Sequence, residues 1–291
     1  MNTVINAYAK LNLSLDIVSK MDNGYHALKT VMQTVSLCDQ VSITCEPGSG
    51  IVAASNFKYI PNDNRNIAVK AVQAFFELHD INGYQASVKI KKRIPVCAGL
   101  GGGSTDAAAV LRALDKLFKT DMTKEQLEDL GAKLGSDVPF CIAGGTVLAE
   151  GRGEIMTPLP PIPECHVVIC KPKLSISTPE LFSKIDCGKI KRRPDTQGII
   201  TALEQGSLPE VARRMYNVFE SFLPPKSGVI ADIKAKLFEA DALGAVMTGT
   251  GSAVFGLFDD RNCAQTAYNS LKYSHRDTFL CKTKPSDEII V

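Results

Sequence analysis

A glycine-rich stretch is the part of this chain best suited to chemistry: residues 95–106 have the sequence PVCAGLGGGSTD. Gly99, Gly101, Gly102 and Gly103 place four glycines within five positions. Glycine lacks a Cβ atom, so backbone N–H groups can approach and point at a bulky anion. An amphipathic helical spacing follows, and the positive end of a helix dipole attracts phosphate. The stretch predicts a polyphosphate cradle; the alternative is an ordinary turn in which residue 104, 105 or 106 caps the helix.

Two common phosphate-binding motifs do not fit this stretch. The Walker loop closes with Gly-Lys-Ser/Thr, whereas Gly103 is followed directly by Ser104. The dinucleotide fingerprint needs glycine or alanine at the place that Ser104 occupies. The predicted cradle therefore belongs to a different class of phosphate site.

The pattern Pro-x-x-x-Gly-Leu-Gly-Gly-Gly-Ser-Thr-Asp resembles the phosphate loop of the GHMP kinases, a family of small-metabolite kinases. The triple glycine followed by Ser-Thr-Asp is most similar to the branch that acts on 4-diphosphocytidyl-2-C-methyl-D-erythritol (CDP-methylerythritol). The resemblance implies ATP along this loop, with Mg²⁺ offsetting the triphosphate charge and no all-protein metal cage. The implied ATP-binding residues are Pro95, Val96, Cys97, Ala98, Gly99, Leu100, Gly101, Gly102, Gly103 and Ser104, together with Asn66. Cys97 departs from the pattern, because relatives in this branch often have glycine there, which leaves the local backbone shape open.

The segment 5–17 alternates apolar and polar residues, which is typical of a β-strand. Lys10 and Asn12 fall on its polar side and point the same way, about 7 Å apart along the strand. The pattern alone predicts a solvated strand face. However, residues 6–13, NAYAKLNL, are similar to the opening strand of the family. The resemblance implies that Lys10 is catalytic and that Asn12 holds the polar tail of the acceptor.

A carboxylate follows the helix predicted over residues 124–134, which is expected to stop at Gly135. Asp137 precedes Val138 and Pro139 and could simply be the N-cap of a short helix. The segment Gly-Ser-Asp-Val-Pro-Phe resembles the family segment that contains the catalytic aspartate. Such a carboxylate can accept the proton of an acceptor hydroxyl, or orient that hydroxyl, during phosphoryl transfer. Lys10 would place positive charge near the transferred group and favour ionised Asp137.

Residues 22–24, Asp-Asn-Gly, predict a hairpin turn, and Tyr25 and His26 follow it directly. Thr178 is predicted as the N-cap of a helix that contains Phe182. From the pattern alone, His26 is a surface residue and Phe182 a core residue. The resemblance instead implies an acceptor site made of Tyr25, His26, Thr178 and Phe182, with a cytosine ring between Tyr25 and Phe182. One such stack is worth roughly 1–3 kcal/mol.

The remaining elements are predicted from periodicity and turn residues. Asn66 is expected to cap a helix over 66–78 that buries Ile67, Ala71, Ala74, Phe75 and Leu78; its contact with adenine is implied by the resemblance. The turn within residues 244–258 resembles a third family motif, which lies against the phosphate loop. Further helices are predicted over 197–205, 209–222, 228–240 and 261–272, and strands over 85–94, 144–150, 153–158, 166–170 and 278–282.

Composition limits the classes of partner. The chain has 291 residues, 45% hydrophobic and 22% charged, and a net charge of +2, which favours neither a nucleic acid nor a membrane partner. No signal peptide and no membrane-spanning segment are expected. Nine cysteines without a Cys-x-x-Cys pair predict reduced thiols in the cytoplasm and no zinc site. The basic clusters 89–93 and 189–193 are expected to be solvated faces.

A proline-rich segment, residues 157–163, marks the predicted domain boundary. It divides the chain into domains 1–157 and 164–291. The resemblance implies an α+β, two-domain GHMP kinase fold, with an N-terminal domain like domain 2 of ribosomal protein S5, a ferredoxin-like C-terminal domain and an active site in the cleft between them. It also implies ATP-dependent phosphorylation of the 2-hydroxyl of CDP-methylerythritol in the non-mevalonate isoprenoid pathway.

Two alternatives stay open. Another GHMP kinase, of the homoserine or mevalonate type, would share the loop but would not need Tyr25, His26 and Phe182. A non-catalytic nucleotide-binding protein would keep the glycines and need neither Lys10 nor Asp137. The sequence does not predict an oligomeric state.

Overall fold

The computed structural model describes residues 1–22 and 24–286, which form two compact units. Unit 1 consists of Met1–Ala9, Cys38–Val96 and Gly101–Ala143, and unit 2 of Lys10–Leu37, Cys97–Leu100 and the residues from Gly144 on. The chain passes from one unit to the other several times, because the long strands β1 (Asn2–Lys20) and β2 (His26–Pro47) each supply residues to both. The predicted division into domains 1–157 and 164–291 stays a prediction. Contacts between residues assign 10–37, 97–100 and 144–157, which lie in the first predicted domain, to unit 2.

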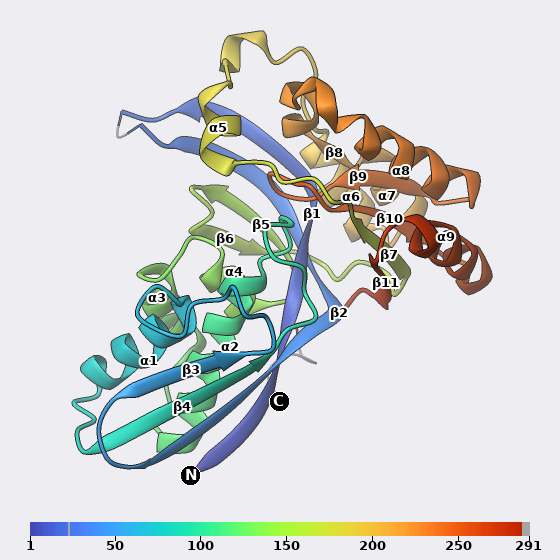
Figure 1. Ribbon diagram of the computed structural model, residues 1–291. Helices are drawn as coiled ribbons and strands as arrows, with labels where there is room; N and C mark the ends of the chain where they lie inside the picture. The colour runs from blue at the N-terminus through green and yellow to red at the C-terminus, as the bar shows by residue number, and fades with distance from the viewer. Residues whose placement is uncertain (23, 287–291) are drawn as a thin grey trace. The chain divides into compact units, whose positions relative to one another are not determined.

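Unit 1 combines strands with four helices. The second half of β2 pairs antiparallel with β4 (Tyr84–Lys91), and β3 (Ile51–Ser55) pairs parallel with β4. Ala86, Val88 and Ile90 are buried, as the period of two in this strand predicts. The helices are α1 (Ile67–Leu78), α2 (Gly102–Phe118), α3 (Lys124–Ala132) and α4 (Val138–Ala143). Helix α1 packs against β3, β4 and α2 (Figure 1).

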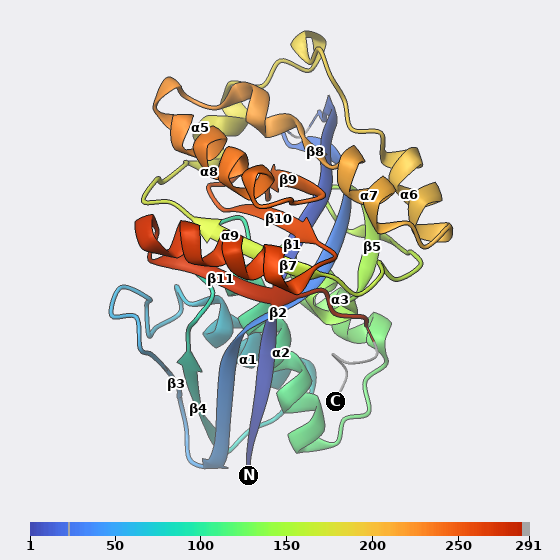
Figure 2. The same cartoon turned by 90° about the vertical axis from the view of Figure 1, so that its right-hand side faces the viewer.

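Unit 2 contains a four-stranded antiparallel sheet of order β11-β7-β10-β9. Its strands are β7 (His166–Lys171), β9 (Gly244–Met247), β10 (Val254–Phe258) and β11 (Asp277–Lys282). Two helices, α8 (Gly228–Glu239) and α9 (Arg261–Ser274), pack against this sheet, as Figure 2 shows. Their apolar stripes bury Ile233, Leu237, Ala264 and Leu271 against strand residues such as Val254 and Phe258. This sheet with its two helices is the arrangement expected of a ferredoxin-like domain.

Unit 2 also contains the second half of β1 and the first half of β2. Strand β5 (Thr146–Gly151) pairs antiparallel with residues 28–33 of β2 and with β6 (Ile155–Pro158), which confirms the predicted strand pair. The remaining elements are α5 (Thr178–Ser183), α6 (Thr196–Glu204), α7 (Leu208–Arg214), β8 (Tyr216–Asn217) and 3₁₀ turns at Cys187–Lys189, Val218–Phe222 and Pro225–Ser227.

The predicted helix over 209–222 is wrong in its second half. Helix α7 ends at Arg214, and the next residues form β8, which pairs parallel with Ser14 and Leu15 of β1. Asn217 then donates its amide hydrogens to the carbonyl groups of Met247 and Gly249, at 2.7 and 2.8 Å. These partners lie far away in the sequence, so a local helical pattern cannot reveal them.

Three smaller predictions are also corrected. Helix α3 ends at Ala132, and its C-cap is Lys133, so Gly135 is not the residue that ends it. Ser177, not Thr178, caps α5, because its hydroxyl accepts the Glu180 N–H. In α1 the buried face is shifted from the predicted one: Leu78 is exposed, whereas Val69 and Val72 are buried.

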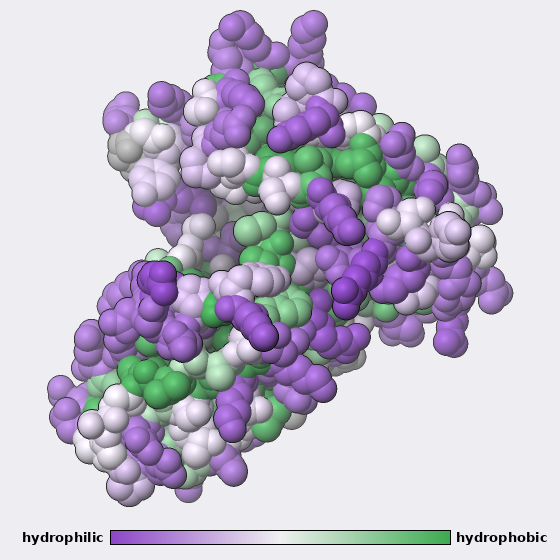
Figure 3. Space-filling model, viewed as in Figure 1, coloured by the Kyte–Doolittle hydropathy of each residue, from purple (hydrophilic) through white to green (hydrophobic). Residues whose placement is uncertain are grey.

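The surface view in Figure 3 is mainly hydrophilic, with apolar side chains exposed in small areas between polar ones. This agrees with a core in which Phe140, Phe219, Phe255 and Phe258 are fully buried. Among the described residues, no helix is both long enough and apolar enough to cross a membrane.

Candidate functional site

The glycine-rich stretch begins helix α2 in unit 1. Gly101 is the N-cap residue with φ +70°, and the helix starts at Gly102. The first N–H groups of a helix have no acceptor within the helix, and no side chain of the described residues caps α2 by a hydrogen bond. The alternative in which residue 104, 105 or 106 caps the helix is therefore wrong. Backbone N–H groups at a helix N-terminus are a suitable site for phosphate oxygens.

The preceding part of the loop, Cys97 to Leu100, belongs to unit 2, where it contacts the turn between β9 and β10. Gly99 has φ +78°, and a Cβ atom there would lie 2.2 Å from the carbonyl oxygen of Thr248. Only glycine fits so close to another backbone segment. The Ala253 N–H donates to the Ala98 carbonyl at 3.1 Å. The predicted approach of the 244–258 segment to the phosphate loop is confirmed at these residues.

Cys97, the departure from the family pattern, has φ +53° and an exposed side chain. This is the left-handed region, which glycine adopts without the steric cost that a Cβ atom adds. The backbone shape that glycine favours is therefore kept at this position, although the residue is cysteine.

Lys10 lies on β1, where the polar side of the strand is buried from Lys10 to Asp16 rather than solvated. Lys10 is 4% exposed and Asn12 is 2% exposed. The Lys10 ammonium donates to the Asn12 amide oxygen at 2.8 Å, and the Asn12 amide nitrogen donates to the Thr30 hydroxyl at 2.8 Å. Thr30 donates in turn to the Ser14 carbonyl at 2.6 Å. The prediction of a solvated strand face is wrong, because a buried chain of hydrogen bonds occupies this side.

Thr248 connects this chain to the glycine-rich loop within unit 2. Its hydroxyl accepts the Asn12 N–H at 3.1 Å and lies 3.2 Å from both the Asn12 amide oxygen and the Gly99 carbonyl, to either of which it can donate. The Lys10 N–H donates to the Leu100 carbonyl at 3.1 Å. These bonds fix the position of the Lys10 side chain relative to residues 97–100.

Aromatic side chains of unit 2 gather near the hairpin between β1 and β2. The rings of His26 and Phe182 lie 5.3 Å apart, and Phe182 meets Phe219 edge-on at 5.0 Å. Burial and the neighbouring Lys20 lower the pKa of His26, so its ring is neutral at pH 7 and can both donate and accept. Tyr25 is 55% exposed. The ring that lies against Phe182 is therefore that of His26, and a cytosine between Tyr25 and Phe182 stays a prediction.

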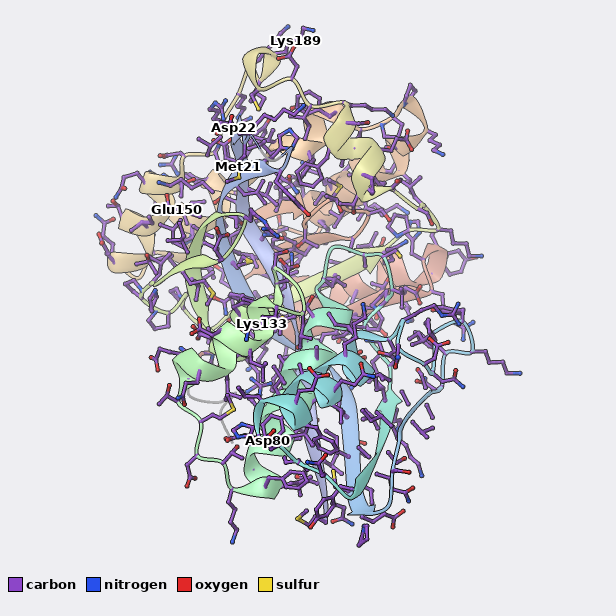
Figure 4. The ribbon with its side chains drawn as sticks, turned by 90° about the vertical axis from the view of Figure 1, so that its left-hand side faces the viewer. Met21, Asp22, Asp80, Lys133, Glu150 and Lys189 are labelled. Carbon is purple, nitrogen blue, oxygen red and sulfur yellow. The ribbon has the colours of Figure 1, made fainter. Side chains whose placement is uncertain are left out.

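The hairpin itself confirms part of the predicted turn. The Met21 N–H donates to the Tyr25 carbonyl at 2.8 Å, and the Gly24 N–H to the Met21 carbonyl at 3.0 Å; Asn23 lies outside the described residues. Figure 4 shows Met21 and Asp22 at the end of the hairpin, and Lys189 in the segment that follows α5.

Arg152, beside Tyr25, and Thr250, beside α5, were not anticipated from the sequence. The guanidinium of Arg152 lies 4.3 Å from the centre of the Tyr25 ring, a cation–π contact. The hydroxyl of Thr178, at the start of α5, lies 2.8 Å from the hydroxyl of Thr250, which comes from the β9–β10 turn. Thr178 is therefore joined to the same turn that approaches the phosphate loop.

Asn66 and Asp137 belong to unit 1. The Asn66 amide oxygen accepts the Ala68 N–H at 3.0 Å, and its amide nitrogen donates to the Pro61 carbonyl at 2.8 Å, which confirms the predicted cap of α1. Its contact with adenine stays a prediction. Asp137 directly precedes α4, and its carbonyl accepts the Cys141 N–H.

Arg112 of α2 anchors the far end of the short helix that Asp137 precedes. It donates to the carbonyl of Cys141 at 3.1 Å, and the residue is half-buried. The helix after Asp137 is thus held by the same helix that begins at the glycine-rich stretch. Among residues 1–22 and 24–286, no group of three or more His, Cys, Asp or Glu side chains could hold a metal ion.

Sequence reasoning missed five residues with structural roles: Thr30, Lys92, Arg152, Thr248 and Thr250. Thr248 and Thr250 lie in the 244–258 motif that the sequence does reveal, whereas Thr30 has no signal of its own. The basic clusters are also corrected. Lys92 is buried and Arg193 forms an ion pair with Asp16 at 2.8 Å, so neither cluster is only a solvated face.

Comparisons with known proteins extend over nearly the whole chain. The family models GHMP kinases N terminal domain and GHMP kinases C terminal match residues 66–145 and 199–276. The chain is 41% identical over 285 residues to the 4-diphosphocytidyl-2-C-methyl-D-erythritol kinase of Clostridium perfringens, covering 97% of this chain and 99% of that protein. It is 41% identical over 280 residues to the corresponding kinase of Caldicellulosiruptor saccharolyticus, covering 96% of each.

Solved structures also resemble this chain over nearly its full length. The crystal structure of a 4-(cytidine 5'-diphospho)-2C-methyl-D-erythritol kinase is similar with a TM-score of 0.81 and 29% identity, covering 97% of this chain and 99% of the other. A homoserine kinase from Cytophaga hutchinsonii is similar with a TM-score of 0.71 and 19% identity, covering 97% and 95%. At that identity the second likeness concerns the fold alone.

Proposed function

Because this chain belongs to the GHMP kinase family, we propose that it transfers the γ-phosphoryl group of ATP to a hydroxyl of CDP-methylerythritol. The α+β GHMP kinase fold that the sequence predicted is confirmed by the same comparisons. The substrate follows from the names of relatives that match nearly the full length of the chain. The implied acceptor position is the 2-hydroxyl, and the implied route is the non-mevalonate isoprenoid pathway.

The buried lysine of β1 is the observation that carries this proposal. A lysine that is only 4% exposed loses most of its hydration, so specific partners must hold its ammonium. Asn12 fixes the direction of the Lys10 ammonium, and Asn12 is fixed by Thr30 and Thr248. A non-catalytic nucleotide-binding protein has no need for such an oriented ammonium beside a phosphate loop.

In the proposed reaction, the acceptor oxygen bonds to the γ-phosphorus and the bond from that phosphorus to the bridging oxygen of ADP breaks. Asp137 accepts the hydroxyl proton or orients the hydroxyl as this occurs. Lys10 provides positive charge for the oxygens of the transferred group. Backbone N–H groups of the glycine-rich loop hold the phosphates of ATP.

The cytidine end of the acceptor would bind among the aromatic side chains of unit 2. The neutral His26 ring can donate to and accept from the polar edge of cytosine. Phe182 and Tyr25 supply apolar faces on which a base can stack. In this proposal Arg152, which now lies over Tyr25, occupies a face of that ring.

Mg²⁺ would bind through the triphosphate oxygens of ATP, where it neutralises charge that develops during transfer. All nine cysteines lie in the described part of the chain and are thiols, which supports the expectation of a cytoplasmic protein.

The first experiment measures ADP release with ATP and Mg²⁺ for three acceptors: CDP-methylerythritol, homoserine and mevalonate. We expect release only with CDP-methylerythritol. Release with one of the others would assign the chain to a different GHMP activity. Binding of ATP without release for any acceptor would favour the non-catalytic alternative.

The second experiment tests Asp137 with the nearly isosteric change Asp137→Asn. Asparagine caps a helix as well as aspartate does, so a role limited to capping predicts a stable and active variant. The catalytic role predicts normal melting and substrate binding, with turnover lower by roughly 10²–10⁴. Normal turnover would remove Asp137 from the mechanism.

A further inference from the structure

Lys92 forms a buried cluster with two carboxylates in unit 1. Lys92 follows β4 and is 4% exposed, and it forms ion pairs with Asp39 of β2 and with Asp106 of α2, the latter at 2.7 Å. Both carboxylates are also buried. Burying three ionisable side chains costs free energy unless they pair with one another, so the presence of this cluster calls for an explanation. Nothing in the mechanism above uses it.

The cluster holds both ends of the glycine-rich stretch. Asp39 accepts the backbone N–H groups of Arg93 and Ile94, the latter at 2.8 Å, just before the stretch begins. Lys92 donates to the carbonyl of Gly102 at 3.0 Å, in the first turn of α2. The segment that leads into the loop and the helix that leaves it are therefore attached to the same three side chains.

The glycine at position 102 fits this arrangement. A Cβ atom there would lie 3.1 Å from Ile94 and 3.3 Å from the Lys92 ammonium. The Lys92 side chain thus lies directly beneath the helix N-terminus, on the protein side. The N–H groups of the same turn are left to face a ligand.

The hydrogen bonds leave one carboxylate oxygen of the cluster without a donor. Asp39 Oδ2 has the Lys92 ammonium, whereas Asp106 Oδ1 has no hydrogen-bond donor among the described residues. A buried oxygen without a donor disfavours the ionised carboxylate and favours a proton on Asp106. Burial, above all, and the nearby Asp39 carboxylate raise the pKa of Asp106 to about 8, although Lys92 opposes the rise. The two carboxylates raise the pKa of Lys92 despite its burial, so the lysine stays charged.

We propose that Lys92 is a positioning residue for ATP, and that it acts within a cluster kept at zero net charge by a proton on Asp106. The proposal rests on the ATP-binding role of the loop. Among the described residues, the charged groups that face Asp106 are Lys92, after β4, and Asp39, on β2. Loss of the Asp106 proton leaves a net negative charge one helical turn below Gly102, where it repels the phosphates of ATP.

The experiment measures the KM for ATP at pH 7, 8 and 9, with saturating acceptor and Mg²⁺, for the parent protein, Asp106→Asn and Lys91→Met. Asparagine cannot ionise, so Asp106→Asn keeps the cluster neutral at every pH. Lys91 is the exposed lysine next to Lys92 and serves as the matched control. Comparison between proteins at one pH cancels the ionisation of ATP itself.

We expect the KM for ATP to rise between pH 7 and 9 in the parent and in Lys91→Met about three- to tenfold more than in Asp106→Asn. This is the effect expected of one added negative charge at this distance from the phosphates. The KM for the acceptor should not follow this pattern. Identical pH profiles in all three proteins would overturn the proposal. If no protein shows ATP-dependent turnover, the proposed function fails, and carboxyl-carbon NMR then tests the cluster: an Asp106 signal that titrates at the ordinary aspartate pKa overturns it as well.

Discussion

Lys10 in unit 2 and Lys92 in unit 1 are each 4% exposed, and they belong to separate networks of hydrogen bonds. Lys92 lies between two carboxylates and a backbone carbonyl. Lys10 donates to the side-chain amide of Asn12, which belongs to a chain of neutral hydroxyl and amide groups. Lys92 joins β2 to the first turn of α2, whereas the Asn12 network joins Lys10 to residues 97–100 of the glycine-rich stretch. Equal burial therefore does not mean an equal role.

The largest expected effect comes from Lys10→Met, which removes the oriented charge and keeps the length of the side chain. We expect turnover to fall by about 10²–10³, the usual cost of one lost group that stabilises developing charge. The melting temperature should change little, because Asn12 retains Thr30 and Thr248 as partners. Single-turnover rates and thermal melts check this, with Lys91→Met as control. A large fall in melting temperature with normal turnover would make Lys10 a structural residue.

The next effect, from Lys92→Met, should be mainly on stability. It leaves Asp39 and Asp106 buried without their cation, and breaking a buried pair in this way costs about 3–5 kcal/mol. Urea unfolding of Lys92→Met and Lys91→Met measures the difference. If both variants unfold at the same urea concentration as the parent, the contrast between the two lysines is wrong.

A third variant, Phe182→Ala, separates acceptor binding from packing. Loss of one base stack should weaken acceptor binding by about 1–3 kcal/mol and leave ATP affinity nearly unchanged. Phe182 also packs against the core of unit 2, so Phe222→Ala, at the edge of the same core, is the matched control. Calorimetric titration with acceptor and with ATP analogue gives both affinities. Equal weakening of the two would show that Phe182 acts only through packing.

The smallest effect is a dependence of stability on pH that Asp106 causes. Its pKa is about 8 in the folded protein and near 3.8 when unfolded, so the native state holds one more proton between these values. This contribution to stability is complete below pH 3.8 and is lost as the pH rises to about 8. The free energy of unfolding should fall by about 1 kcal/mol per pH unit from pH 6 to 8 in the parent, and less steeply in Asp106→Asn. Urea unfolding at three pH values measures the slopes; parallel slopes would contradict the shifted pKa.

The sequence predicted what depends on neighbours in the chain. The glycine-rich turn into α2, the cap of α1 at Asn66 and the hairpin after β1 follow from spacings of a few residues, and the structure contains each of them. Errors of one residue occurred where two residues compete for a role, as with Ser177 and Thr178 at the start of α5.

What the sequence did not predict depends on residues that fold together from distant positions. Asp39 and Lys92 are separated by 53 positions, and each looks like an ordinary charged surface residue by itself. The pairing of Tyr216 with Ser14 likewise ends the helical pattern after α7 without a local signal. Burial of the polar side of β1 could not be predicted, because alternation shows that a strand has two faces but not what covers each.

The repeated passage of the chain between its two units limits how its gene can be rearranged. A fragment that begins after the proline-rich segment carries Thr248 and the β9–β10 turn but lacks Asn12, Thr30 and Gly99, which belong to the same unit. Recombination at that segment would therefore join a turn to a strand and a loop from a different parent. Chimaeras of two such enzymes should retain activity when residues 10–37 and 97–100 come from the parent that supplies the C-terminal part. The choice of parent for each segment should therefore follow the unit in which the segment packs, and not its position in the sequence.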